Sequence, residues 1–85
     1  MDDRRKRLKF QANHRGMKEV DLILGSFADA NLPDLTPEQL DQFEELLGAP
    51  DQDIFAWLIG KEPFPDEFNN EIMKMVQNFE FPGKL

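Results

Sequence analysis

Residues 35–48 read LTPEQLDQFEELLG, and this stretch carries signals for both ends of a helix. Thr36 is a good N-cap, Pro37 suits the first helical position, and Gln39 can close a capping box with Thr36. Gly48 follows the last apolar pair and is expected to end the helix. Apolar residues recur every three or four positions, so one face of this helix is predicted to be buried. They are Leu40, Phe43, Leu46 and Leu47.

Four further segments, on both sides of this stretch, have the apolar spacing of helices. Strands are not expected, because apolar and polar residues do not alternate and the chain has only two Val. Connections of about three to six residues favour packing between neighbouring helices. We predict an all-α fold, a compact five-helix bundle, as a single domain over residues 1–85 with a loose C-terminal tail from about residue 80. The four segments are residues 3–12, 15–30, 51–59 and 65–79.

The segments differ in how firmly we expect them to pack. Segment 3–12 is poor in apolar residues and is predicted to be the least firmly packed helix. Segment 51–59 is apolar nearly all round, so we expect it to be the central helix, with Asp51 as its N-cap and Trp57 in the core. Asn13 is the candidate cap for segment 15–30.

Composition excludes several classes of protein. The 85 residues include no Cys, so no disulfide framework or thiolate metal site can form. No apolar run approaches the roughly 18 residues of a membrane span, and the basic N-terminus lacks the apolar stretch of a signal peptide. We therefore expect a cytoplasmic protein without membrane insertion.

The charge is unevenly distributed along the chain. Residues 1–18 carry seven Lys or Arg against two Asp, a net charge of +5, whereas residues 19–85 have a net charge of −12. Such asymmetry suggests an interaction arm. Nucleic acid is disfavoured as a partner, because the acidic remainder would repel phosphates. An acidic groove of another protein, or the acidic body of this one, is the expected partner of the basic segment.

No catalytic constellation is present in the sequence. His14 is the only histidine, Ser26 has no base at a recognisable spacing, and no glycine pattern for a dinucleotide or phosphate occurs. We predict that the protein is not an enzyme, holds no metal and retains no cofactor.

The stretch NHRGMKE at residues 13–19 raises a different question. A helical projection of segment 15–30 gathers charged residues opposite its apolar stripe, together with one leucine, and puts a glycine at the edge. Arginine before glutamate is the weaker order for a helical pair, and a glycine inside a helix costs about 0.5–1 kcal/mol. Features that weaken a helix locally often serve function, so a partner-contact surface is one interpretation. Its residues are Arg15, Gly16, Lys18, Glu19 and Leu22.

The other interpretation is purely structural. Arg15 and Glu19 can form an ordinary surface pair worth about 0.3–0.5 kcal/mol. Gly16 can simply ease a sharp junction after the first helix. The residues alone leave both interpretations open.

The motif RGMKEVDLIL resembles the R-G-x-x-E signature of the FAD assembly factors of succinate dehydrogenase, the SdhE/YgfY family. LTPEQLDQFEELL and DIFAWL are also similar to bacterial members, and the resemblance extends to about residue 79. It implies a five-helix bundle that acts as an assembly chaperone. The implied partner is the flavoprotein subunit of succinate dehydrogenase, or of fumarate reductase, to which FAD becomes covalently attached through a histidine.

Carried over by motif position, the signature residues are Arg15, Gly16 and Glu19, and Asp21 matches a recurrent acidic position. FAD would then be the ligand handled on the partner, and the free factor is expected to be a monomer. The favoured mechanism is conformational. Alternatives are direct delivery of FAD, an antitoxin-like role, or a nucleic-acid adaptor that uses the basic N-terminal helix.

Overall fold

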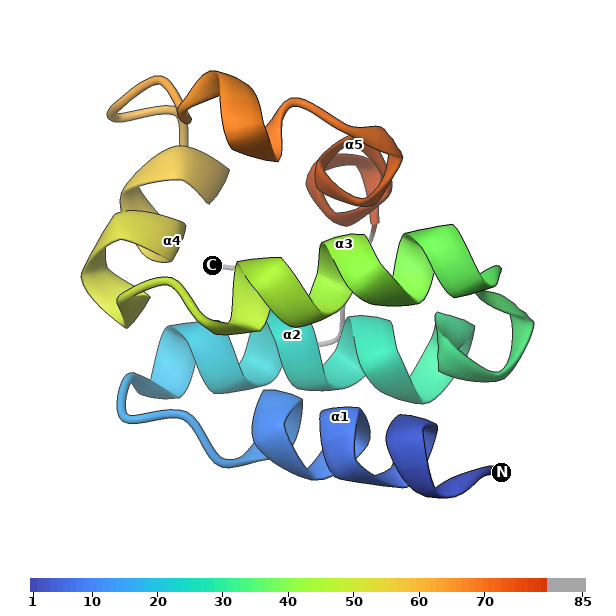
Figure 1. Ribbon diagram of the computed structural model, residues 1–85. Helices are drawn as coiled ribbons and strands as arrows, with labels where there is room; N and C mark the ends of the chain where they lie inside the picture. The colour runs from blue at the N-terminus through green and yellow to red at the C-terminus, as the bar shows by residue number, and fades with distance from the viewer. Residues whose placement is uncertain (80–85) are drawn as a thin grey trace.

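The computed structural model describes residues 1–79, and these form α-helices and two short 3-10 turns without a strand (Figure 1). The prediction of an all-α, five-helix bundle is confirmed for this part of the chain. The expected tail from about residue 80 lies outside the described residues. The helices are α1 (Asp3–Asn13), α2 (Lys18–Asn31), α3 (Pro37–Leu47), α4 (Asp51–Leu58) and α5 (Glu71–Asn78), and the 3-10 turns are η1 (Leu32–Asp34) and η2 (Asp66–Phe68).

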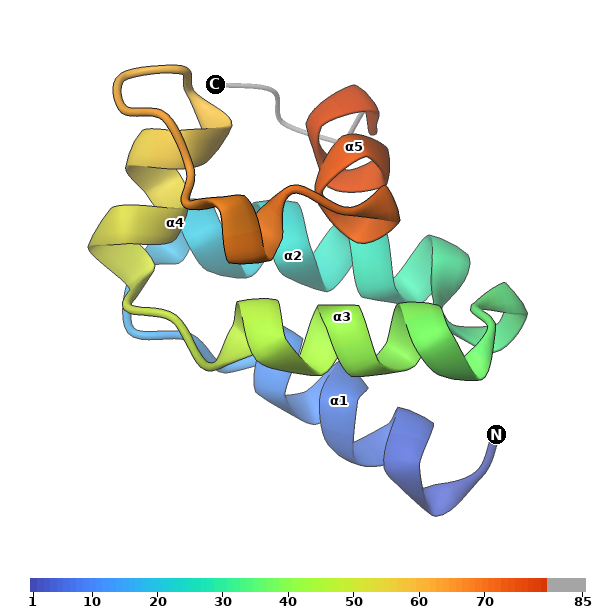
Figure 2. The same ribbon diagram turned by 45° about the horizontal axis from the view of Figure 1, so that its top comes forward.

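α2 runs through the middle of the bundle and contacts α1, η1, α4 and α5 (Figures 1 and 2). The expectation that segment 51–59 is the central helix is wrong. Only two residues of α4 are buried, whereas six residues of α2 are. The longer helix offers more surface to its neighbours and is therefore the one they surround. The buried residues of α2 are Val20, Ile23, Leu24, Gly25, Phe27 and Ala28.

The first helix buries two of its 11 residues, the smallest share of the five helices, as expected from its few apolar residues, yet it packs closely against α2. Leu8 and Ala12 of α1 are fully buried. The Arg5 guanidinium adds hydrogen bonds to the carbonyl oxygens of Leu32, at 3.0 Å, and Leu35, at 2.6 Å. A count of apolar residues misses this contribution, because here an arginine fixes the helix to the turn that follows α2.

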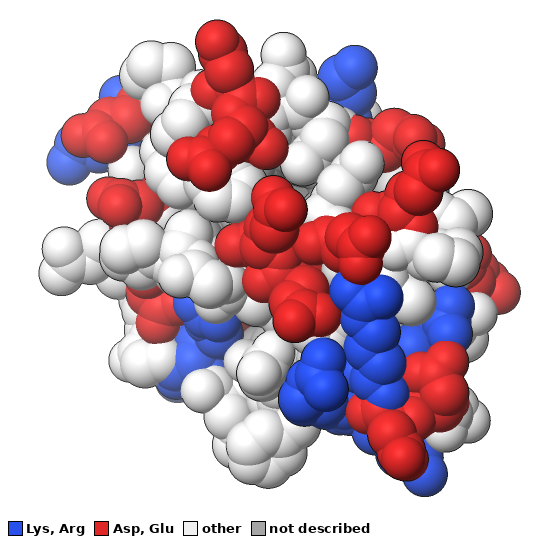
Figure 3. Space-filling model, viewed as in Figure 1, with Lys and Arg blue, Asp and Glu red and all other residues white. Residues whose placement is uncertain are grey.

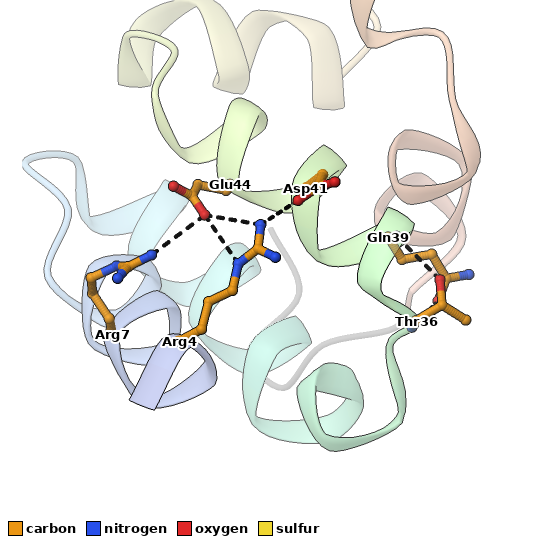
Figure 4. A network of polar contacts seen from close by, with 6 residues as sticks. All are labelled: Arg4, Arg7, Thr36, Gln39, Asp41 and Glu44. Carbon is orange, nitrogen blue, oxygen red and sulfur yellow. Dashed lines mark hydrogen bonds and ion pairs between the residues drawn. The ribbon is translucent and has the colours of Figure 1, made fainter. Parts of the chain in front are cut away.

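Ion pairs join α1 to α3. Arg4 lies 2.5 Å from Asp41 and 3.1 Å from Glu44, and Arg7 lies 3.5 Å from Glu44 (Figure 4). In Figure 3, basic side chains gather toward the bottom of the face seen in Figure 1, directly below acidic side chains at its centre. The basic N-terminal segment therefore pairs with the acidic body of the same protein, which was one of its two expected partners.

The end signals of α3 act as predicted. The Thr36 hydroxyl accepts a hydrogen bond from the Gln39 backbone N–H at 3.2 Å, and the Gln39 side chain accepts one from the Thr36 N–H at 2.9 Å (Figure 4). Gly48 is the C-cap. Trp57 is buried as expected, with its ring 5.1 Å from that of Phe68.

The predicted helix over 65–79 is interrupted. It begins as the turn η2, and α5 starts only at Glu71. The Asn70 side chain accepts a hydrogen bond from the Met73 N–H at 2.9 Å, so Asn70 is the N-cap of a new helix. Asparagine favours caps over helix interiors because its side chain competes for nearby backbone groups.

Candidate functional site

α2 begins at Lys18, so Arg15 and Gly16 precede the helix. The expectation that Arg15 shares a helical face with Glu19, with Gly16 at the edge of the apolar stripe, is wrong, as is Asn13 as the cap of α2. Asn13 is the last residue of α1, and Met17 occupies the N-cap without a side-chain bond. Arg15, Gly16 and Met17 instead belong to the connection between α1 and α2.

The Arg15 side chain turns inward, toward the junction between α3 and α4. Its Nε atom donates to Oδ1 of Asp51 at 2.7 Å. Its other two nitrogens donate to the carbonyl oxygens of Leu47, at 2.5 Å, and Ala49, at 3.0 Å. The Arg15 and Asp51 side chains are 12% and 19% exposed, which makes this a largely buried ion pair. Arg15 therefore braces the bundle.

Asp51 also holds the backbone of the connection. Its second oxygen, Oδ2, accepts hydrogen bonds from the N–H groups of Gly16 at 2.9 Å and Met17 at 3.1 Å. The expectation that Asp51 caps α4 is wrong, because Pro50 is the N-cap of that helix and Asp51 is its first residue. We call the Arg15–Asp51 pair, with these two backbone bonds, the Asp51 clasp.

The clasp determines the ionisation of Asp51. Partial burial raises the pKa of Asp51, but the hydrogen bonds and charge of Arg15 and the N–H groups of Met17 and Gly16 outweigh it. The net result is a pKa below the ordinary value for aspartate. Asp51 is therefore a carboxylate at neutral pH, with both oxygens occupied.

Asp21 closes the connection from the other side. Its carboxylate accepts a hydrogen bond from the Arg15 backbone N–H, and the residue is half-buried. This acidic position therefore shapes the turn into α2.

The outer face of α2 retains part of the predicted surface. Lys18 is exposed, and Glu19 and Leu22 are half-buried. Leu22 belongs neither to the core of the described residues nor to the side chains packed against that core. These three residues are within four positions of each other on one helix, next to the connection.

Gly16 is exposed, and neither the backbone conformation nor the packing around it requires a glycine. Gly60 is the only residue of the described chain with a positive φ, so Gly16 does not need glycine's conformational freedom. A Cβ atom at position 16 would lie 3.4 Å from Oδ2 of Asp51, an ordinary contact. Bare backbone is thus presented at the surface where an alanine would fit.

Gly16 borders an open hollow of about 500 Å³ at the end of α1. The Asp51 clasp forms one side of it, and α1 and α3 form the others. The hollow is lined by Phe10, Gln11, His14, Arg15, Gly16, Glu44, Leu47, Gly48 and Asp51.

The chemistry of the site is recognition by charge, hydrogen bonding and close backbone approach. Within residues 1–79 no three potential metal ligands lie together. Sequence analysis missed the role of Asp51, because an aspartate at the start of an apolar helix has the pattern of an ordinary cap. Only the fold brings it to Arg15, a residue 36 positions earlier.

Comparison with known proteins identifies the family of the chain. The sequence pattern of the family described as the flavinator of succinate dehydrogenase matches residues 6–80. The chain belongs to this family. The match includes the whole connection and both partners of the Asp51 clasp.

Individual relatives agree with the family assignment. The mitochondrial succinate dehydrogenase assembly factor 2 of Dictyostelium discoideum is 49% identical over 74 residues, which are 87% of this chain and 52% of that protein. The FAD assembly factor SdhE of Acetobacter pasteurianus is 47% identical over 64 residues, 75% of this chain and 59% of that protein. The chain thus spans between half and three fifths of the length of these relatives. No helix among the described residues has the length and apolar character needed to traverse a bilayer.

Proposed function

We propose that this protein is an assembly factor that binds the flavoprotein subunit of succinate dehydrogenase and promotes covalent attachment of FAD to it. Membership of the flavinator family supports this function, as do relatives whose names describe FAD assembly and succinate dehydrogenase assembly. We further propose that it acts by binding, without donating a catalytic group, and retains no FAD of its own.

The contact surface consists of the connection and the outer face of α2. The observation that carries this proposal is the exposed Gly16, because neither its backbone angle nor internal packing requires glycine there. A partner's backbone or ring that approaches closely does require it. The proposed surface is built from Arg15, Gly16, Lys18, Glu19, Asp21 and Leu22.

These residues divide into two groups. Arg15 and Asp21 act from behind, since their side chains hold the connection in place and are mostly turned away from solvent. Gly16, Lys18, Glu19 and Leu22 face outward and meet the partner. A connection fixed before binding loses little conformational freedom on association, so more of the contact energy appears as affinity.

The mechanism we propose is a shift in the population of partner conformations. The factor binds the arrangement of the flavoprotein that presents its histidine to the flavin more tightly than other arrangements. We further propose that the flavoprotein subunit of fumarate reductase, the other partner that the resemblance implies, is a second client. The free factor acts as a cytoplasmic monomer in this scheme.

The test is co-expression with the flavoprotein subunit, followed by detection of covalent flavin fluorescence on a denaturing gel. Gly16→Arg fills the bare site with a long side chain and is expected to abolish covalent flavin on the partner. Gly16→Ala adds only a methyl group that the fold accommodates, so its far-UV spectrum and urea midpoint should match those of the unchanged protein.

Two further variants separate contact from charge. Glu19→Gln is expected to reduce flavin attachment, whereas Glu38→Gln, an exposed carboxylate at the start of α3, should leave it unchanged. Undiminished covalent flavin with Gly16→Arg in a folded protein would contradict the proposed contact surface.

A further inference from the structure

Phe10 is an unusual residue for the outside of a charged helix. Its side chain is 62% exposed, and only Met1 and Ile59 are comparably exposed among the large apolar side chains of the described residues. The opposite side of α1 buries Leu8 and Ala12, so the fold makes no use of Phe10 in its core. Aromatic side chains are enriched in protein interfaces, so an exposed ring that borders the Gly16 hollow is a candidate contact residue.

Phe10 is held in a fixed position by His14, one turn further along. The two rings are stacked, with centroids 3.8 Å apart and planes inclined by 16°. The Nδ1 atom of His14 donates a hydrogen bond to the Phe10 carbonyl oxygen at 2.8 Å. We call this stacked pair the Phe10–His14 ridge, and its two contacts favour the geometry in which it would meet a partner.

The ridge separates two hollows. The first is the hollow of about 500 Å³ that Gly16 and the Asp51 clasp border. The second, of about 460 Å³, lies on the other side of α1 and is lined in part by Met1, Lys6 and Lys9. Since both hollows include Phe10 and His14 in their walls, a partner that covers Gly16 also reaches the ridge.

We propose that the Phe10–His14 ridge is the apolar anchor of the interface with the flavoprotein, and that it inserts into an apolar cleft bordered by carboxylates on that partner. This inference rests on the proposed function and extends its surface from the connection onto α1. Because the ridge borders the same hollow as Gly16, the partner that contacts the ridge is the flavoprotein that binds at Gly16. The lysines beside the second hollow set its charge, because Lys6 has no ion pair within residues 1–79 and Lys9 has only a long one, 3.8 Å from Asp29.

The chain provides a matched control for this inference. Ile59 is 50% exposed and is the C-cap of α4, a helix that lies on the other side of α2 from α1 (Figures 1 and 2). Phe10→Ala and Ile59→Ala each remove an exposed apolar side chain, so neither should change the urea midpoint appreciably. The two positions differ in one respect: Phe10 lines the Gly16 hollow and Ile59 does not.

The experiment titrates each purified variant of the full chain against the FAD-loaded flavoprotein subunit and measures both affinity and the rate of covalent attachment. Phe10→Ala is expected to weaken binding at least about tenfold, as truncation of an aromatic anchor does, and Ile59→Ala to leave it within about twofold. At saturating concentrations of Phe10→Ala the attachment rate should recover, because the ridge supplies affinity and Gly16 supplies the geometry. Phe10→Trp keeps a large ring and should retain most of the affinity.

Each outcome has a distinct meaning. Unchanged affinity with Phe10→Ala, while Gly16→Arg abolishes attachment, overturns the ridge but leaves the proposed function intact. No effect of either variant overturns the contact surface of the proposed function. If the free protein dimerises and Phe10→Ala abolishes the dimer, the ridge serves a second copy of the chain, and the inference is also wrong.

Discussion

At the scale of single residues, Arg15 shows how one side chain can serve function from the inside. Its guanidinium satisfies the last carbonyl oxygens around the end of α3 and the carboxylate that begins α4. Planar geometry and several donors suit arginine to this task, and lysine could not make the same set of bonds. The residue therefore supports the recognition surface by holding it in place.

Removal of this guanidinium should be costly. Arg15→Ala leaves Oδ1 of Asp51 and two carbonyl oxygens without the guanidinium donor, and we expect a loss of about 2–4 kcal/mol in the free energy of unfolding. Arg4→Ala breaks more exposed ion pairs and should destabilise the fold much less. Urea denaturation followed by far-UV circular dichroism measures both, and equal losses would contradict a special role for Arg15.

At the scale of elements, the Asp51 clasp links the first residue of α4 to the two residues before α2. The pKa of Asp51 is depressed in the folded protein, so the folded state holds its proton less tightly than the unfolded state. The stabilisation by this group is fully present above the unfolded pKa of about 3.9 and is lost as the pH falls toward the folded pKa.

A pH series tests this linkage. Asp51→Asn cannot ionise, so it should be less stable than the unchanged protein at pH 6, and the difference should shrink as the pH falls below about 4. The measurement is the urea midpoint of both proteins between these conditions. Glu62→Gln replaces an exposed carboxylate after α4 and should show no such convergence, whereas a constant difference for Asp51→Asn would contradict the linkage.

The elements also show how far local sequence can predict a fold. The capping box at Thr36 involves neighbours three residues apart, so its pattern is complete within the chain segment. The apolar spacing continues across Asn70, so it predicts one unbroken helix. The single capping residue that begins a new helix there is a weaker signal than this periodicity. The sequence pattern predicts Arg15 on a helix face, because Glu19 is four residues away and the actual partner, Asp51, is distant in sequence. Packing between helices decides in favour of Asp51.

At the scale of the whole molecule, opposite charge and a shared core hold the bundle together. Basic residues of α1 face acidic residues of α3, while Leu8 and Ala12 of α1 enter the same core as the residues of α2 (Figures 1 and 3). The acidic surplus of the chain is thus partly compensated where the helices meet. A single core also predicts that distant parts unfold together.

Cooperative unfolding can be tested with a substitution in α1 and a fluorescent reporter, Trp57, in α4. Leu8→Ala removes a fully buried side chain and should cost about 2–5 kcal/mol in the free energy of unfolding. The midpoints from Trp57 fluorescence and from far-UV circular dichroism should fall together, as expected for one domain. Leu22→Ala, at a half-exposed leucine, should cost much less, and a Trp57 midpoint that stayed at its original value would indicate separate unfolding units.

The position of Trp57 inside the bundle has a practical consequence. This indole is the only one in the chain, and it is 8% exposed in a molecule whose longest dimension is 35 Å. Flavins absorb light in the range where indole emits. A flavin brought to the Gly16 hollow would therefore quench Trp57 by resonance energy transfer through space, and the loss of emission would time each encounter without any added dye.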